Sequence, residues 1–168
     1  MATKPPIVAD SSPLISAARA HRLCLVRKVY RTLILPEAVY NEIVIQGRSK
    51  PGASEIKKAK NEWIQVMTVQ NRQAVQNLQV KFGIGESEAI VLAEELKTTL
   101  LADEAAVILE ARRRGIPLTS TIMMLFEAKT KGFTPSIKKE LDKFIKAGFR
   151  IDEELYQNAL RQAGECEL

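Results

Sequence analysis

The chain has 168 residues, of which 46% are hydrophobic and 27% charged, with a formal net charge of +5. This length is typical of one compact domain, and no apolar run is long enough to cross a bilayer. The N-terminus lacks a secretory pattern, and two cysteines with one histidine argue against a disulfide or a zinc site. We expect one cytoplasmic domain over 1–168, without membrane contact. Its basic charge favours a polyanionic partner but decides little alone.

The apolar run 7–9 is typical of a strand buried on both faces of a parallel sheet. Ser12 and Pro13 then predict a helix start, with serine as the cap and proline in the first helical position. Because Ser12 supplies the cap, Asp10 has no evident structural role. The run 33–35 is the second predicted strand.

The middle of the chain alternates between helical and strand patterns. Pro36 opens a predicted helix that carries Glu42, and 53–60 is predicted as a basic, exposed helix. Residues 63–69 alternate apolar and polar side chains, which predicts a short strand at a sheet edge. The stretch 86–93 is rich in alanine, leucine and glutamate and predicts a further helix.

The last predicted strands flank a helix. The apolar run 100–102 predicts a buried strand that ends at Asp103, 105–114 predicts a helix, and 116–118 predicts a short strand. The chain from about residue 122 onward is predicted to be helical. Strands that alternate with helices predict a three-layer α/β/α domain with a central, mostly parallel sheet of four to five strands.

Several carboxylates lie at the boundaries between predicted strands and helices. In sheets of this class the active site lies beyond the carboxyl ends of the strands, where strand order reverses. Mg²⁺ prefers oxygen ligands and is commonly held by one or two carboxylates, waters and substrate phosphates. We predict that Asp10, Glu42, Glu88 and Asp103 converge on a metal ion. The alternative is that Glu86 and Asp103 merely favour the first turns of helices and that Glu42 is solvated.

Helix geometry separates neighbouring acids. Glu86 and Glu88 lie on nearly opposite sides of one helix, so only one of them should face a shared site. Asp103 and Glu104 differ by about a quarter of a turn, so both can approach it.

Other constellations are weaker. The glycines at 83 and 85 lack the third glycine of a dinucleotide fingerprint, and His21 is too near Ser11 and Ser12 in sequence for a catalytic triad. An aspartyl phosphatase would need an aspartate where Ser12 stands. Two groups of basic residues could either contact RNA or simply be solvated. For the second of the two groups given next, solvation is favoured, because cations are stabilised at the C-terminal end of a helix. The two groups are Arg48, Lys50, Lys57, Lys58 and Lys60, and Arg112, Arg113 and Arg114.

Four segments in order carry a family resemblance: IVADSSPLI, LPEAVYNEI, GIGESEAIVLA and LLADEAAVILEARRRGI. Together they resemble a branch of the PIN-domain nucleases related to VapC toxins, over nearly the whole chain. The resemblance implies a PIN-like fold in which an acidic quartet binds Mg²⁺ or Mn²⁺. It gives catalytic positions to Asp10, Glu42, Glu88 and Asp103, with Asp10, Glu88 and Asp103 as metal ligands, Ser12 and Thr121 as substrate contacts, and Glu86 and Glu104 as additional acids.

The function implied by this resemblance is hydrolysis of RNA phosphodiester bonds by the toxin of a type II toxin–antitoxin pair. The expected partners are RNA, a small antitoxin protein and a second copy of the chain. The alternative is a catalytically inactive RNA- or antitoxin-binding module that keeps the fold. Whether Asp103 or Glu104 is the fourth acid stays open.

Overall fold

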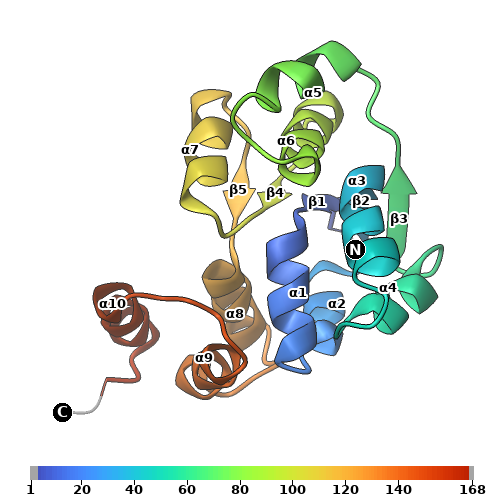
Figure 1. Ribbon diagram of the computed structural model, residues 1–168. Coiled ribbons are helices and arrows are strands. Elements are labelled where there is room, and N and C mark those ends of the chain that lie inside the picture. Colours follow the sequence, from blue (N-terminus) through green and yellow to red (C-terminus); the bar gives the residue numbers. More distant parts are fainter. Residues whose placement is uncertain (1–3, 167–168) are drawn as a thin grey trace.

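The computed structural model describes residues 4–166, in which five strands form one sheet of order β3-β2-β1-β4-β5 (Figure 1). All neighbouring strands are parallel. The strands are β1 (Ile7–Ala9), β2 (Leu33–Pro36), β3 (Ile64–Met67), β4 (Leu100–Leu101) and β5 (Leu118–Thr119). The prediction of a mostly parallel sheet of four to five strands is confirmed, and β3 lies at an edge as expected.

Strand order reverses between β1 and β4. The chain moves outward from β1 through β2 to β3 and then returns to place β4 on the free side of β1. The backbone N–H of Asp10 donates to the carbonyl of Leu101 at 3.0 Å, so the sheet pairing continues just past both strands. Crevices at such a reversal are the usual ligand sites of open α/β sheets. Asp10 and Asp103 lie at this reversal, just after the carboxyl ends of β1 and β4.

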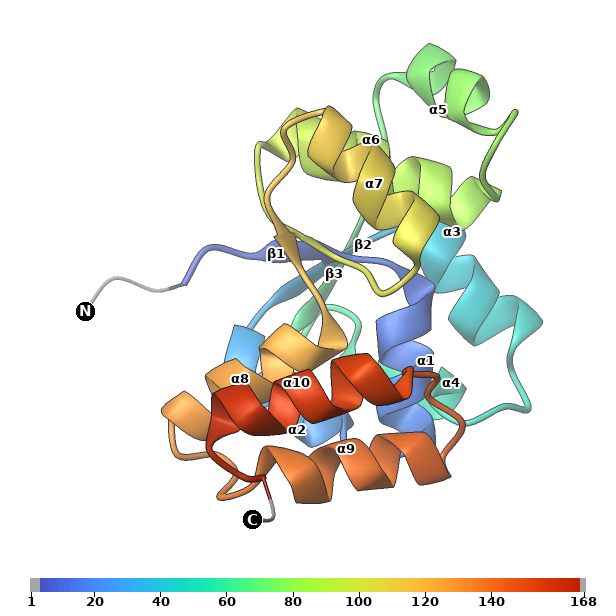
Figure 2. The same ribbon diagram turned by 90° about the vertical axis from the view of Figure 1, so that its left-hand side faces the viewer.

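Helices cover both faces of the sheet, which confirms the three-layer α/β/α arrangement (Figure 2). β1, β2 and β4 lie in the middle layer, and this explains why all their side chains are buried without alternation. Above the sheet in Figure 2 are α5 (Arg72–Leu78), α6 (Ile84–Leu96) and α7 (Ala105–Arg113), and α3 (Glu37–Tyr40) lies to the right of the strands at about their level. Below it are α1 (Ser11–Arg19), α2 (Leu23–Tyr30), α8 (Thr121–Thr130) and α9 (Ile137–Lys146), with α10 (Glu153–Ala163) packed on α9.

The start of α1 differs from the sequence-based expectation. The helix begins at Ser11, and Asp10 is its N-cap, with Oδ1 accepting from the N–H of Ser11 at 2.8 Å. The prediction that Ser12 is the cap is therefore wrong, and Asp10 does have a structural role. Pro13 still fits, because the N–H groups of the first turn have no partner within the helix.

The helix predicted after Pro36 is divided in two. α3 is followed by a π-helix, η1 (Asn41–Gln46), which carries Glu42 in its first turn. π-Helical turns are rare and occur frequently at functional sites. α4 (Ala53–Ala59) follows a turn and exposes Lys57 and Lys58 as predicted, although it buries Ile56. Among residues 4–166, no helix is long and apolar enough to span a membrane.

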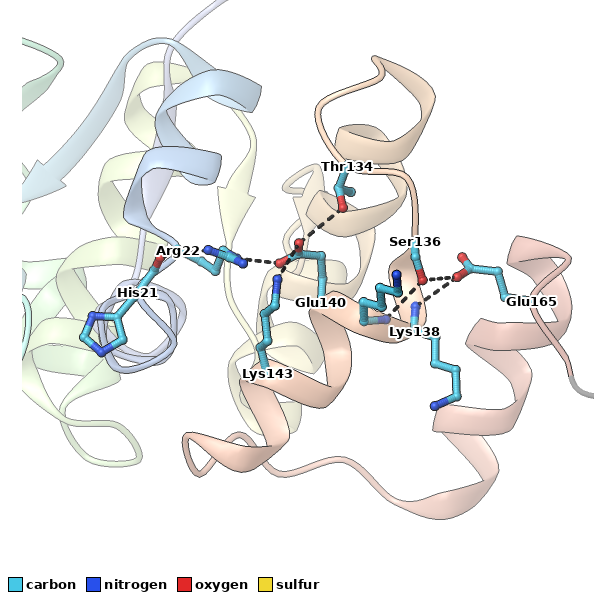
Figure 3. Close-up of polar contacts among 9 residues, drawn as sticks. His21, Arg22, Thr134, Ser136, Lys138, Glu140, Lys143 and Glu165 are labelled. Carbon is cyan, nitrogen blue, oxygen red and sulfur yellow. Dashed lines mark hydrogen bonds and ion pairs between the residues drawn. The ribbon is translucent and has the colours of Figure 1, made fainter.

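The C-terminal helices are fixed by two polar networks, both drawn in Figure 3. In the first, the carboxylate of Glu140 in α9 accepts from Nε of Arg22 at 2.7 Å and from the hydroxyl of Thr134 at 3.2 Å. In the second, Glu165 accepts from the hydroxyl of Ser136, the N-cap of α9. The first network joins α9 to the start of α2, and the second joins the end of α10 to the start of α9.

Glu165 gives the fold a defined acid sensitivity. Burial would raise the pKa of Glu165, but donors on Ser136, Lys129, Ile137 and Lys138 outweigh it and lower the pKa from 4.5 to about 2. A lowered pKa stabilises the folded state above about pH 4.5, and this stability is lost as the pH falls toward 2. We expect Glu165→Gln to lower the free energy of unfolding by about 1–2 kcal/mol at pH 7. Urea unfolding should show this difference shrinking below pH 4, and a constant difference would contradict it.

Candidate active site

A cleft of about 520 Å³ opens beyond the carboxyl ends of β1 and β4. Five carboxylates line it, those of Asp10, Glu42, Glu86, Asp103 and Glu104. They come from four different places in the chain: the end of β1, η1, the first turn of α6 and the segment after β4. The cleft therefore lies at the reversal of strand order, where the sequence placed it.

Asp10 is the most buried acid of the cleft, with 1% of its surface exposed. Burial raises the pKa of Asp10 from its ordinary 3.8 to about 7, and the N–H of Ser11 only partly offsets this. The negative charges of Glu86, Glu42 and Glu104 raise the pKa of Asp10 further. These acids are thus close enough to Asp10 for their charges to act on it, and Glu42 shares the cleft with Asp10. Their convergence on a metal ion stays a prediction.

Asp103 is oriented by Thr121. The N–H of Thr121 donates to Oδ1 of Asp103 at 2.8 Å and its hydroxyl donates to Oδ2 at 2.6 Å. Burial raises the pKa of Asp103, these two hydrogen bonds lower it, and the charge of Glu104 raises it. Thr121 is only 1% exposed. It therefore holds an acid in place and does not reach a substrate, in contrast to the contact expected from the sequence, whereas Ser12 does line the cleft.

Glu42 reaches the cleft because Gly85 leaves room for it. A Cβ on Gly85 would lie 3.0 Å from Oε2 of Glu42 and 3.5 Å from the side chain of Val39. The absence of a side chain at Gly85 leaves space for the Glu42 carboxylate and for Val39 of α3 beside the first turn of α6. The sequence singled out this glycine only as a possible phosphate-binding glycine, and its packing role was missed.

Glu88 does not join the other acids. It is 4% exposed, and its carboxylate accepts from the N–H of Ala38 at 2.9 Å and from Nη1 of Arg72 at 2.7 Å. Glu86 instead lines the cleft and accepts from the N–H of Gly83 at 3.1 Å. The two glutamates do face different ways, as helix geometry predicts, but the residue that faces the cleft is Glu86.

Basic side chains border the acidic centre. Arg19 and Arg150 line the main cleft, and a smaller cleft of about 250 Å³ continues from it past Arg19 and Glu42 to Lys50. Lys50 belongs to the basic group that the sequence left open between RNA contact and solvation. An acidic centre with a cationic border suits a phosphodiester, whose charge the border attracts while the centre needs a cation.

The donor set of the cleft fits Mg²⁺ or Mn²⁺. Carboxylate oxygens are the hard ligands that these ions prefer, and crowded carboxylates are stabilised by a cation. Within the part of the chain that the structure describes, no three His, Cys, Asp or Glu side chains lie close enough together to ligate one ion. Mg²⁺ does not require such a cage, because it keeps several waters and commonly takes one or two protein carboxylates plus substrate oxygens.

Comparison with known proteins agrees with this geometry. Residues 6–165 match the model of a family described as DUF3368: PIN domain. The matched span contains every strand and helix named above, and all the acids of the cleft. No curated protein matches the chain.

Proposed function

The chain belongs to the PIN-domain family, and from this premise we propose that it is a metal-dependent endoribonuclease acting at the acidic cleft. The observation that carries the proposal is the set of carboxylates around the carboxyl ends of β1 and β4, bordered by arginines. Helix capping gives Asp10 and Glu86 each a local role, but it gives no reason for Glu42, Asp103 and Glu104 to line the same cleft. A shared divalent cation supplies that reason.

Asp10 and Glu86 are the proposed direct ligands, and Asp103 is the proposed ligand through a bound water, because no three acids among residues 4–166 lie close enough together to hold one ion directly. Glu86 takes the ligand role that the sequence gave to Glu88, because the carboxylate of Glu88 accepts hydrogen bonds from Arg72 and from the N–H of Ala38. When bound, Mg²⁺ or Mn²⁺ would polarise a phosphodiester and lower the pKa of an attacking water. Glu42 and Glu104 supply further negative charge at the same cleft.

The remaining polar residues of the cleft have positioning roles. Thr121 fixes both carboxylate oxygens of Asp103, so that this acid does not rotate when a substrate enters. Arg19 and Arg150 would hold the phosphates on either side of the reacting bond, since arginine matches phosphate geometry with paired donors. Ser12, in the first turn of α1, can donate a hydrogen bond to a phosphate oxygen at the centre of the cleft.

The finer proposal is that the chain is the toxin of a type II toxin–antitoxin pair, with RNA as its substrate. It is supported by the resemblance of its four acidic segments to the VapC-related branch. Such a toxin would bind a small antitoxin and can pair with a second copy of itself. A second candidate function is a catalytically inactive binding module, and the observation that favours it is the spacing of the acids, no three of which form a closed cage among residues 4–166.

The test is incubation of a mixed RNA pool with Mg²⁺ or Mn²⁺, then with a chelator, and then with metal restored. We expect cleavage that the chelator stops and the metal restores, together with none from an Asp10→Asn protein purified in parallel. Equal cleavage by the two proteins would overturn the mechanism. Salt-sensitive RNA binding without any turnover would instead support the binding module.

A further inference from the structure

A second groove, of about 370 Å³, joins the acidic cleft. Asp103, Phe149 and Arg150 line both spaces, so a chain held at the acids has a continuous path into the groove. Side chains of α8 and α10 supply much of its lining. The wall formed by α10 is held in place by the contact of Glu165 with Ser136 (Figure 3).

The interior of this groove is apolar and contains a fixed aromatic ring. The ring of Phe149 packs edge-on against Phe144, with centroids 6.0 Å apart and planes at 80°. Met123 and Leu155 also line the groove and are 57% and 46% exposed. Flat aromatic and flexible apolar side chains of this kind provide a stacking surface for a planar ring.

Amide side chains lie along the α10 side of the groove. Asn158 and Gln162 both line it and are four residues apart, which places them on the same side of the helix. An amide carries both donors and acceptors, the combination that pairs with the edge of a nucleobase. Oδ1 of Asn158 already accepts from Nη2 of Arg161 at 2.7 Å, so the donors of Asn158 and the amide of Gln162 are the groups offered to a ligand.

Cations stand beside the groove. Arg112 and Arg150 line it, and in the described chain neither lies within ion-pair distance of a carboxylate. The neighbouring Arg113 and Arg114 differ, because both pair with Glu110. The arginine run, for which the sequence favoured solvation at a helix end, is thus divided: Arg113 and Arg114 pair with Glu110, whereas Arg112 lines the groove. This charge favours a nucleic acid over an apolar peptide.

We propose that the groove binds one unpaired nucleobase of the RNA, next to the bond that is cut. Phe149 and Met123 would contact the face of the base, Asn158 and Gln162 its edge, and Arg112 and Arg150 the flanking phosphates. The assignment rests on the proposed function for the identity of the substrate. Because a duplex hides the faces of its bases, it implies single-stranded RNA and a nucleotide preference at one position beside the cut.

The test uses a short single-stranded RNA that carries 2-aminopurine at one position at a time. The RNA is bound without metal to the Asp10→Asn protein, which leaves it intact. Stacking in the groove should quench the fluorescence at one position. Replacing Asn158 and Gln162 together by alanine should weaken that quenching and reduce the cleavage preference at the same position about fivefold or more. The matched control is Gln157→Ala, which lies on another side of α10 and should change neither.

The outcomes separate the two proposals. Quenching that depends on Asn158 and Gln162 but not on Gln157 supports the groove assignment, even if the wild-type protein cuts no RNA and the nuclease proposal fails. Cleavage of RNA without quenching at any position, or with quenching that the paired substitution leaves unchanged, overturns the assignment and leaves the nuclease proposal intact. Absence of RNA binding at this groove, with capture of a peptide instead, also overturns it.

Discussion

Replacing Asp10 by asparagine is expected to abolish RNA cleavage and, at the same time, to stabilise the metal-free protein. Asparagine keeps the acceptor for the N–H of Ser11 but removes the buried charge. Cleavage should fall by at least about 100-fold, because asparagine is a poor replacement for a carboxylate ligand of Mg²⁺. A stabilised but inactive variant would indicate that Asp10 is retained for chemistry at a cost to the fold.

The gain in stability should depend on pH. Because the pKa of Asp10 is raised from 3.8 to about 7 in the folded state, the folded protein binds this proton more tightly than the unfolded chain. Wild-type stability therefore falls as the pH rises from about 4 to 7, and the asparagine variant escapes this loss. The difference at pH 8 should be about 2–4 kcal/mol, since a rise to about 7 corresponds to at most about 4 kcal/mol. It should nearly vanish at pH 4.

Urea unfolding in the presence of a chelator measures this difference at both pH values. The matched control is Asp142→Asn on the surface of α9, where the donor of Tyr156 and the amine of Lys138 lower the pKa of the carboxyl group. That substitution should slightly destabilise the protein at pH 8. If both substitutions stabilise the protein at pH 8, or both destabilise it, the raised pKa of Asp10 does not explain the effect of Asp10→Asn.

The strands were predictable from local patterns, and so was the end of the sheet at which the acidic cleft lies. Continuous apolar runs such as 7–9 and 100–102 require helices on both faces, and each ends at an acid. Parallel strands have their carboxyl ends at the same end of the sheet, so Asp10 and Asp103, which follow two of these strands, had to lie at that end. The chain order of helices and strands then left few topologies that obey the right-handed crossover rule.

The errors concern choices that sequence pattern leaves nearly equal. Ser12 and Asp10 are both good caps, and the one next to the strand takes the role, because the helix starts immediately after β1. Glu86 and Glu88 both suit a helix start, and periodicity does not say which side faces the sheet edge. The useful signal was the position of Glu86 in the first turn of α6, since a crossover helix begins near the carboxyl ends of the strands. The π-helical turn around Glu42 has no local signature in the sequence, and neither does the space that Gly85 leaves for the Glu42 carboxylate.

Glu86 and Glu88 provide the second large test, because the same substitution should have different effects two residues apart. Glu86→Gln is expected to reduce metal-dependent cleavage by about 100-fold or more, since it removes a proposed ligand. Glu88→Gln should leave cleavage within a few-fold of the wild type, although it weakens the ion pair with Arg72. That pair is half exposed on the arginine side, with 49% of the Arg72 side chain accessible, so its loss should cost only about 1 kcal/mol of stability.

A titration of Asp10 gives this comparison a readout that does not depend on turnover. The charge of Glu86 raises the pKa of Asp10, whereas the carboxylate of Glu88 does not line the cleft and is bound by Ala38 and Arg72. Glu86→Gln should therefore lower the pKa of Asp10 in the metal-free protein, and Glu88→Gln should not, as measured by NMR of the carboxyl carbon. Equal losses of cleavage in the two variants, or a shift of Asp10 only in the Glu88 variant, would return the third acidic position to Glu88. A selective loss in the Glu86 variant would support Glu86 as the acid of α6 that holds the metal in the cleft.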